Sequence, residues 1–237
     1  METRINKYLS ESGVCSRRAA DKLIEEKRVT VDGETAVMGT KVREGQCVCV
    51  DGKRITKETQ KILLAFNKPV GIVCTAQEKE KNNVISYIHY PKRIYPVGRL
   101  DKDSQGLLLL TNDGELMNQI LKAENGHEKE YVVTVDKIVT DEFLLGMGSG
   151  VPVLDRITSP CRVEKVNEHT FRIVLTQGLN RQIRRMCEYF GYSVVRLERI
   201  RIMNIRLGNL KSGEYRNLTE KEYRQLHDII KKQTMGE

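Results

Sequence analysis

The spacing of hydrophobic residues predicts two helices at the start of the chain. Ile5, Leu9 and Val14 are spaced for the apolar side of an amphipathic helix. A second helix is expected after Ser16, because a serine at the N-cap accepts a hydrogen bond from a backbone N–H group that the helix leaves unpaired. The chain therefore begins with a pair of helices.

Strict alternation of apolar and polar residues then replaces the helical period and predicts strands. Residues 29–31 and 47–50 alternate in this way. The Asp32-Gly33 pair between them is typical of a tight hairpin turn. Residues 51–61 contain few apolar side chains, so we interpret them as a linker.

These patterns predict two domains with different architectures. Residues 1–60 are expected to form a small helix-helix-strand domain, and residues 61–237 a larger α+β domain. Its strands outnumber its helices and follow one another at hairpin spacing, which favours a largely antiparallel mixed sheet flanked by helices. A turn is expected at residues 67–71. The predicted strands are 62–66, 72–74, 107–111, 131–135, 161–163 and 171–175, and the predicted helices are 115–121, 141–147, 181–190 and 219–231.

The composition is that of a globular protein without a membrane segment. The 237 residues are 39% hydrophobic and 30% charged, and they suffice for two domains with their own cores. No apolar run approaches the roughly 18 residues of a membrane helix. The first residues have neither the apolar core of a secretory signal nor the character of a transit peptide. We therefore expect a cytoplasmic protein, and nothing in the chain demands more than a monomer.

The metal-binding and cofactor-binding patterns that a sequence can display are missing. The six cysteines include no Cys-x-x-Cys pair, so we expect reduced thiols, although Cys47 and Cys49 would face one side of a strand as packing residues or metal ligands. The four histidines are dispersed, and we assign them no catalytic or metal role. With no glycine-rich phosphate loop or dinucleotide fingerprint either, we expect no cofactor.

The charge distribution points to an anionic partner. The formal net charge is +8, and residues 177–216 carry nine basic residues against three acidic ones. Nearly all of these cations are arginines, whose planar guanidinium suits bidentate phosphate contact.

Basic residues also cluster on the predicted helix pair, namely Arg4, Lys7, Arg17, Arg18, Lys22, Lys27 and Arg28. On charge alone, a solvated helix face and an RNA-binding face both remain open. Residues 4–10, 13–20 and 29–33 together resemble an S4 RNA-binding domain. This resemblance implies that Arg4, Lys7, Arg17, Arg18 and Lys22 contact RNA phosphates.

Residues 95–106 form the most unusual local sequence, a polar loop that precedes an apolar strand. Loops at strand ends often carry catalytic groups. Asp101, Asp103 and Ser104 could equally form side-chain-capped turns, as these residue types often do. The loop alone does not decide between the two interpretations.

The stretch from residue 98 to 114, Gly-Arg-Leu-Asp-Lys-Asp-Ser-Gln-Gly-Leu-Leu-Leu-Leu-Thr-Asn-Asp-Gly, resembles the signature of the pseudouridine synthases. The similarity is to the branch that modifies ribosomal RNA and carries an S4 domain. It continues through residues 67–71, 127–131 and 177–192. The resemblance implies an enzyme that isomerises uridine to pseudouridine in structured RNA without a cofactor.

The same resemblance implies that Asp101 is the catalytic aspartate. Isomerisation cleaves the bond between ribose C1′ and uracil N1, rotates the base and joins C1′ to C5. A carboxylate could stabilise or trap a cationic C1′, or remove a ribose proton to give a glycal, and both routes stay open. Tyr131 matches the active-site tyrosine, which would stack on the base and help to move the C5 proton. Without the resemblance, Tyr131 would be interpreted as an ordinary strand residue.

Arginines complete the expected site. Arg184 matches the family arginine that pairs with the aspartate and keeps its carboxylate ionised. Arg181 is the alternative partner, and phosphate contact is the expected role of Arg181 and Arg185.

Arg99 is expected to hold or displace the target nucleotide. Lys68 is a candidate phosphate contact, although Asn-Lys-Pro is also an ordinary turn sequence.

Three classes of function remain possible at this stage. The favoured one is pseudouridine formation in large-subunit (23S) ribosomal RNA. The same chemistry on small-subunit rRNA or a tRNA anticodon arm is the first alternative. A non-catalytic RNA-binding or ribosome-assembly protein is the second, because the S4 segment and the arginines would suffice for it.

Overall fold

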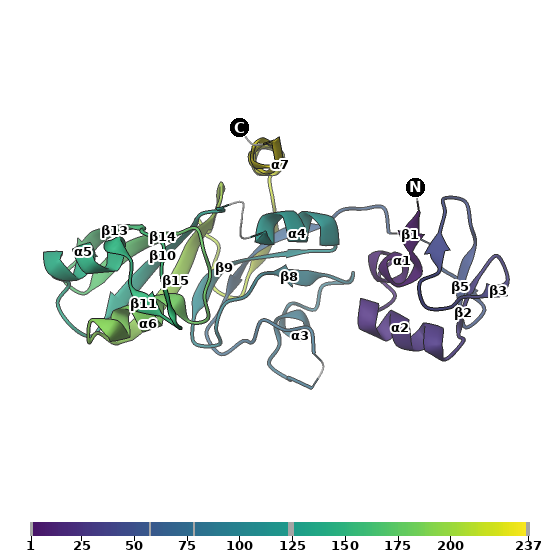
Figure 1. The fold of residues 1–237 in the computed structure, drawn as a ribbon, viewed down its shortest axis with the longest axis horizontal. Helices are drawn as coiled ribbons and strands as arrows, with labels where there is room; N and C mark the ends of the chain where they lie inside the picture. Colours follow the sequence, from purple (N-terminus) through teal and green to yellow (C-terminus); the bar gives the residue numbers. More distant parts are fainter. Residues whose placement is uncertain (1, 57, 78, 123–125, 236–237) are drawn as a thin grey trace. The chain divides into compact units, whose positions relative to one another are not determined.

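Separate hydrophobic cores divide the chain into two units. The computed structural model describes residues 2–56, 58–77, 79–122 and 126–235 (Figure 1). The first unit comprises residues 1–62 with the short segments 90–94 and 112–114, and the second comprises the rest of the chain. None of the helices among the described residues combines the length and the hydropathy needed to cross a membrane.

The first unit combines the predicted helix pair with short strands. Helix α1 (Ile5–Glu11) and helix α2 (Arg17–Glu25) pack on one core with Val29 and Val48. Ser16 caps α2 as predicted, since its side chain accepts a 3.1 Å hydrogen bond from the backbone of Ala19. The strands are β1 (Thr3–Arg4), β2 (Val29–Val31), β3 (Glu34–Thr35), β4 (Lys41–Val42), β5 (Val48–Val50) and β6 (Lys53–Arg54).

One strand of this unit lies in the stretch that we interpreted as a linker. Strand β6 pairs with β5 in the sheet ordered β3-β2-β5-β6. The turn before it is formed by Asp51 and Gly52, both with positive φ. Backbone pairing needs no apolar side chains, so the polar composition of residues 51–61 concealed this strand.

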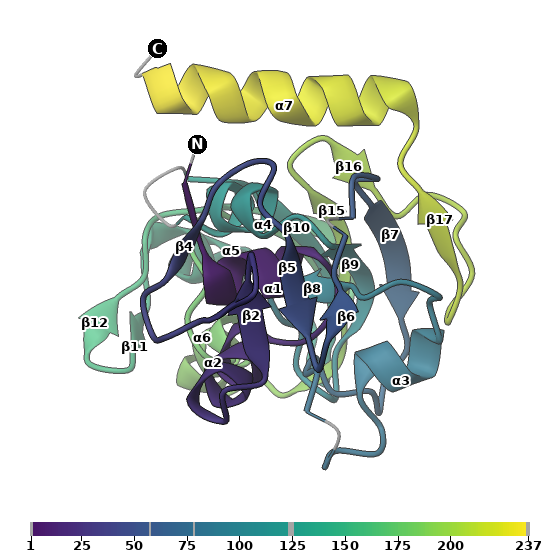
Figure 2. The ribbon, with the colours of Figure 1, turned by 90° about the vertical axis from the view of Figure 1, so that its right-hand side faces the viewer.

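The second unit is built on a nine-stranded mixed sheet. Its main path runs β13-β14-β10-β15-β9-β7-β17, with β8 paired to β9 and β16 to β15. Figure 2 shows β17 beside β7 at one edge. The β15–β9 pair is parallel, whereas the other pairs of this sheet are antiparallel, as expected for the largely antiparallel α+β fold. The strands are β7 (Leu63–Lys68), β8 (Tyr95–Val97), β9 (Gln105–Thr111), β10 (Lys129–Val135), β13 (Arg162–Asn167), β14 (Thr170–Leu175), β15 (Val194–Ile202), β16 (Ile205–Arg206) and β17 (Tyr215–Asn217), and the small hairpin is β11 (Pro152–Val153) with β12 (Arg156–Ile157).

Helices bury the apolar residues of this sheet in two clusters. One cluster joins α5 and α6 to β10 and β14, and Figure 1 shows these helices beside those strands. The other joins α4 and α7 to β7 and β9. The helices of this unit are α3 (Val84–Ile88), α4 (Gly114–Leu121), α5 (Asp141–Ser149), α6 (Gln182–Tyr189) and α7 (Glu220–Met235).

Two local predictions for this unit were wrong, and one long strand was missed. Asn67 and Lys68 continue β7 instead of starting a turn, because their buried side chains donate hydrogen bonds to backbone carbonyls. Residues 72–74 form only an isolated bridge, between Val73 and Asn83. The nine-residue strand β15 was not predicted at all, because its arginines indicate a polar surface. Two of them, Arg199 and Arg201, are buried in the folded protein.

Gly106 is required where β9 and β15 pair. Its φ is +102°, and a Cβ at this position would lie 2.3 Å from the carbonyl oxygen of Arg199. We expect Gly106→Ala to lower the free energy of unfolding by about 2–4 kcal/mol, from backbone strain and overpacking together. Urea unfolding measures this effect. Gly178→Ala is the control, because that glycine has open space around it, and a loss of equal size there would contradict the explanation.

Candidate active site

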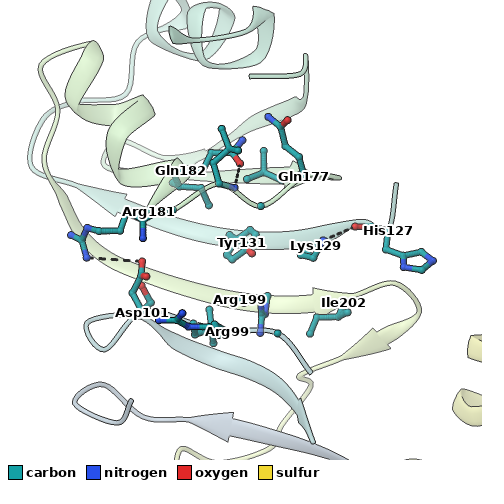
Figure 3. A pocket seen from close by; sticks show the side chains of 18 of the residues that line it. Arg99, Asp101, His127, Lys129, Tyr131, Gln177, Arg181, Gln182, Arg199 and Ile202 are labelled. Atoms are coloured by element: carbon teal, nitrogen blue, oxygen red, sulfur yellow. Dashed lines mark hydrogen bonds and ion pairs between the residues drawn. The ribbon is translucent and has the colours of Figure 1, made fainter. Parts of the chain in front are cut away.

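A cavity of 480 Å³ lies in the second unit, between the loop before β9, the strands β10 and β15, and the segment that leads into α6 (Figure 3). Its described lining residues include a single carboxylate, Asp101. The described lining residues also include six cations, namely Arg99, Lys122, Lys129, Arg181, Arg184 and Arg199. A site with this excess of positive charge attracts an anionic or acceptor-rich ligand.

The loop that carries Asp101 is held by its backbone. The N–H of Gly71 donates a 2.7 Å hydrogen bond to the carbonyl of Lys102. The N–H of Leu100 donates to the sulfur of buried Cys74 at 3.3 Å. These bonds fix the loop on both sides of Asp101, whose side chain remains 37% exposed at the cavity.

Arg181 is the arginine that approaches Asp101. Its Nη1 lies 4.0 Å from Oδ2 of Asp101 and 3.1 Å from Oδ1 of Asp103. Arg181 does not belong to the helix predicted over residues 181–190. It forms the N-cap of α6 with φ +51°. Its side chain points at Asp101 (Figure 3) and also reaches Asp103.

Arg184, the predicted partner of Asp101, contacts Asp103 instead. Its Nη2 donates a 3.0 Å hydrogen bond to the carbonyl of Asp103, and its Nε lies 3.4 Å from that carboxylate. Its Nη1 donates to the carbonyl of Val194 at 3.1 Å. Because two backbone carbonyls hold this buried guanidinium, its position is set by the loop and by β15 rather than by Asp101.

Tyr131 and Arg99 line the same cavity as Asp101. Tyr131 is half-buried on β10 and lines the cavity, with Arg199 of β15 as its cross-strand neighbour. Arg99 is exposed and also lines the cavity, on the same loop as Asp101 (Figure 3). Arg185 does not line the cavity. Its side chain bonds to the carbonyl of Asn180 at 3.1 Å.

The prediction that Lys68 contacts phosphate was wrong. Its side chain is fully buried, and its Nζ donates 2.8 Å hydrogen bonds to the carbonyls of Pro69 and Ile72. Burial lowers the pKa of Lys68, while the negative charges of Asp101 and Asp103 act in the opposite direction. This buried cation holds the backbone of residues 69–72 and cannot reach RNA.

The cations predicted on the first unit are accessible to a large ligand. Arg4, Arg17, Arg18 and Lys22 are exposed. Lys7 is half-buried, and its Nζ lies 3.5 Å from Oε1 of Glu11. All five lie on α1, α2 or the adjoining β1, so the helix pair presents a basic surface.

Arg199, Lys129 and His127 line the cavity although none of them was predicted as a site residue. His127 is buried and its Nδ1 bonds to the carbonyl of Ile120 at 2.8 Å, so a histidine to which we assigned no role forms part of the wall. The alternation of arginine with apolar residues in β15 was the available signal for Arg199.

Comparison with known proteins gives matches along most of the chain. Residues 62–189 match the family described as RNA pseudouridylate synthase, and residues 3–46 match the S4 domain. A protein of Salmonella typhi named dual-specificity RNA pseudouridine synthase RluF is 54% identical over 230 residues, which cover 96% of this chain and 80% of that protein.

More distant relatives are also matched along nearly their whole length. Ribosomal large subunit pseudouridine synthase B of Bacillus subtilis is 34% identical, with 95% of this chain and 96% of that protein covered. A crystal structure of a pseudouridylate synthase superposes with a TM-score of 0.68 at 27% identity, covering 94% of this chain and 99% of the other.

Proposed function

Because this chain belongs to the RNA pseudouridylate synthase family, we propose that it converts a uridine of large-subunit (23S) ribosomal RNA to pseudouridine, with Asp101 as the catalytic carboxylate. The comparisons confirm the enzyme class, the S4 domain and the S4-bearing branch of the family that the sequence motifs indicated, with 54% identity to RluF over 96% of the chain. The target RNA and the roles of the site residues form the proposal.

The observation that carries the proposed mechanism is that Asp101 is the single carboxylate among the described residues lining the cavity, together with six cations. The reaction breaks the C1′–N1 bond and forms a C1′–C5 bond, while C5 loses a proton and N1 gains one. Atoms and electrons therefore balance without a co-reactant. The carboxylate of Asp101 either attacks C1′ or removes a neighbouring ribose proton, and Nη1 of Arg181 lies 4.0 Å from its Oδ2.

Arg181 and Arg184 have different positioning roles in this proposal. Arg181 pairs with Asp101 and Asp103, and Arg184 fixes the backbone of Asp103. The geometry therefore supports Arg181 as the electrostatic partner of Asp101 and Arg184 as the residue that positions the loop.

Tyr131 and Arg99 would receive the extruded uridine. Turning a nucleotide out of folded RNA costs a few kcal/mol. Stacking of the base on an aromatic ring returns about 1–3 kcal/mol, and Arg99 is exposed at the rim of the cavity to hold the displaced strand. Together they offset much of the cost of extrusion.

Mapping of pseudouridines across total RNA from cells with and without the gene tests the proposed target. We expect one or more 23S sites to revert to uridine when the gene is deleted. Loss confined to small-subunit rRNA would contradict the target, and an unchanged map would contradict pseudouridine formation in these cells. The relatives named dual-specificity favour a second substrate class, and a tRNA anticodon arm is our candidate for it.

The basic surface of the first unit predicts a salt-dependent contribution to RNA binding. Arg17→Ala or Arg18→Ala should weaken binding and reduce the slope of log Kd against log salt by about 0.7–0.9 for each phosphate contact removed. Titration of a labelled rRNA fragment over a range of salt concentrations measures the slope. Arg162→Ala, an exposed arginine of β13, should leave it unchanged. An unaltered slope in the Arg17 and Arg18 variants would count against phosphate contact, and the rate on fully bound RNA should stay native.

A further inference from the structure

Arg199 occupies an unusual position for a charged residue. It lies on β15, is only 3% exposed and lines the cavity beside Tyr131, its cross-strand neighbour on β10. Figure 3 shows the two side chains next to each other between Asp101 and Lys129. A buried arginine is costly unless its charge and its donors are used.

The hydrogen bonds of Arg199 leave part of its guanidinium unused. Its Nε donates a 2.7 Å bond to the carbonyl of Leu107, which anchors the side chain to β9. Its Nη2 is buried and has no hydrogen-bond partner among the described residues. An unsatisfied buried donor costs about 1–3 kcal/mol, and such a group in a native site calls for a ligand that accepts from it.

Lys129 places a second cation in the same part of the cavity. It lies two residues before Tyr131 on β10 and therefore on the same face of the sheet. Burial lowers the pKa of Lys129, and the positive charge of Arg199 lowers it further. Its Nζ bonds to the carbonyl of His127 at 3.1 Å, which leaves two of its three protons for a ligand. The pair of cations thus faces a space in which acceptor oxygens are favoured.

The proposed reaction puts such oxygens there. In the proposed binding mode, with the ribose at Asp101 and the base on Tyr131, the uracil carbonyl oxygens O2 and O4 are the acceptors available to Arg199 and Lys129. When the C1′–N1 bond breaks, its electron pair stays on the uracil and spreads over N1, O2 and O4. Donors aimed at the position where charge develops lower the barrier most.

We propose that Arg199, assisted by Lys129, donates a hydrogen bond to a uracil carbonyl oxygen and stabilises the negative charge that the uracil acquires during C1′–N1 cleavage. This role rests on the proposed function, since it requires the sugar to lie at Asp101. The charge disappears when C5 bonds to C1′ and N1 takes up a proton. Arg199 would also hold the detached base in the cavity while it rotates.

The first test compares Arg199→Met and Arg199→Lys in single turnover with a saturating amount of enzyme. We expect Arg199→Met to slow pseudouridine formation by about 10²–10³-fold and Arg199→Lys to recover part of that loss. RNA affinity should change little, because the contact strengthens only as the bond breaks. Arg162→Gln, an exposed arginine of β13, is the charge-matched control and should react at the native rate. Weakened RNA binding with a native single-turnover rate would instead identify Arg199 as a phosphate contact and overturn the proposal.

The second test changes the leaving group. RNA with 5-fluorouridine at the target position yields a more stable uracil anion, because fluorine withdraws electrons. Mass spectrometry of digested RNA measures the disappearance of 5-fluorouridine. The fold-loss of rate caused by Arg199→Met should be at least about 10 times smaller with this RNA than with the uridine RNA. An equal loss on both RNAs indicates a purely structural role and overturns the proposal.

Two further measurements show whether Arg199→Met is folded and whether a failure concerns the role of Arg199 or the proposed function as a whole. If thermal melting shows that Arg199→Met is unfolded, Lys129→Met is tested on the same two RNAs. Its loss of rate should be smaller than that of Arg199→Met and again larger on the uridine RNA than on the 5-fluorouridine RNA. An equal loss on both RNAs again contradicts the proposal. Full activity of an Asp101→Asn enzyme would refute the proposed function. Native rates of a folded Arg199→Met enzyme would refute only the role of Arg199.

Discussion

The Asp101→Asn variant should lose pseudouridine formation by about 10⁴-fold or more while it binds RNA almost as well as the native protein. An amide is neutral, so it neither stabilises a cationic C1′ nor acts as a nucleophile or base toward the ribose. The side chain keeps its size, and the loop is held through the backbone of its neighbours Leu100 and Lys102. Quantification of pseudouridine in an rRNA fragment under single-turnover conditions, with Kd determined in parallel, measures both effects.

Asp103→Asn is the matched control for this experiment. Asp103 lies two residues away and pairs with Arg181 and Arg184, so its loss should disturb the loop and slow the reaction by only about 10-fold. Equal losses in the two variants would mean that the carboxylates act only as a charge cluster. A fully active Asp101→Asn enzyme would leave RNA binding as the better description of this site.

Replacement of Tyr131 should separate its ring from its hydroxyl. Tyr131→Phe keeps the stacking surface but removes a proton-transfer group, and we expect kcat to fall by about 10²–10⁴-fold with little change in KM. Tyr131→Ala also removes the ring, which costs a further 1–3 kcal/mol, or about 10–100-fold in kcat/KM. Steady-state kinetics on the same RNA fragment give both parameters.

A deuterium label at C5 of the target uridine tests the assigned role directly. If the hydroxyl of Tyr131 helps to move the C5 proton, that step limits Tyr131→Phe, and the label should slow this variant more than the native enzyme. The exposed Tyr189 of α6 supplies the control variant Tyr189→Phe, which should behave as the native protein does. A slow Tyr131→Phe enzyme without an isotope effect would argue against proton transfer by this residue.

Local features of this chain were predictable because neighbouring residues decide them. The cap at Ser16 depends on the N–H of Ala19, three residues away. The alternation in β10 and the helical period of α5 reflect short-range geometry. The sequence motif around Asp101 identified the enzyme family by its resemblance to known members, and the comparisons confirm the family.

The partners of the catalytic loop were decided by contacts between distant segments. Arg181 and Arg184 lie about 80 positions from the aspartates that they bind, and one bend with positive φ at Arg181 determines which of them reaches Asp101. Lys68 belongs to a plausible phosphate-binding sequence, yet the strand that contains it is covered on both faces, so its side chain is buried.

The sequence by itself determined the two kinds of domain, the basic helix pair and, through the resemblance of its motifs, the enzyme family, because each depends on residue type and short spacing. Only the tertiary structure decided that β15 enters the sheet between β10 and β9 and brings Arg199 to the side of Tyr131. The physical reason is that buried charges are stabilised by specific carbonyl and carboxylate partners, and the residue pattern of a strand does not say which distant strands it pairs with.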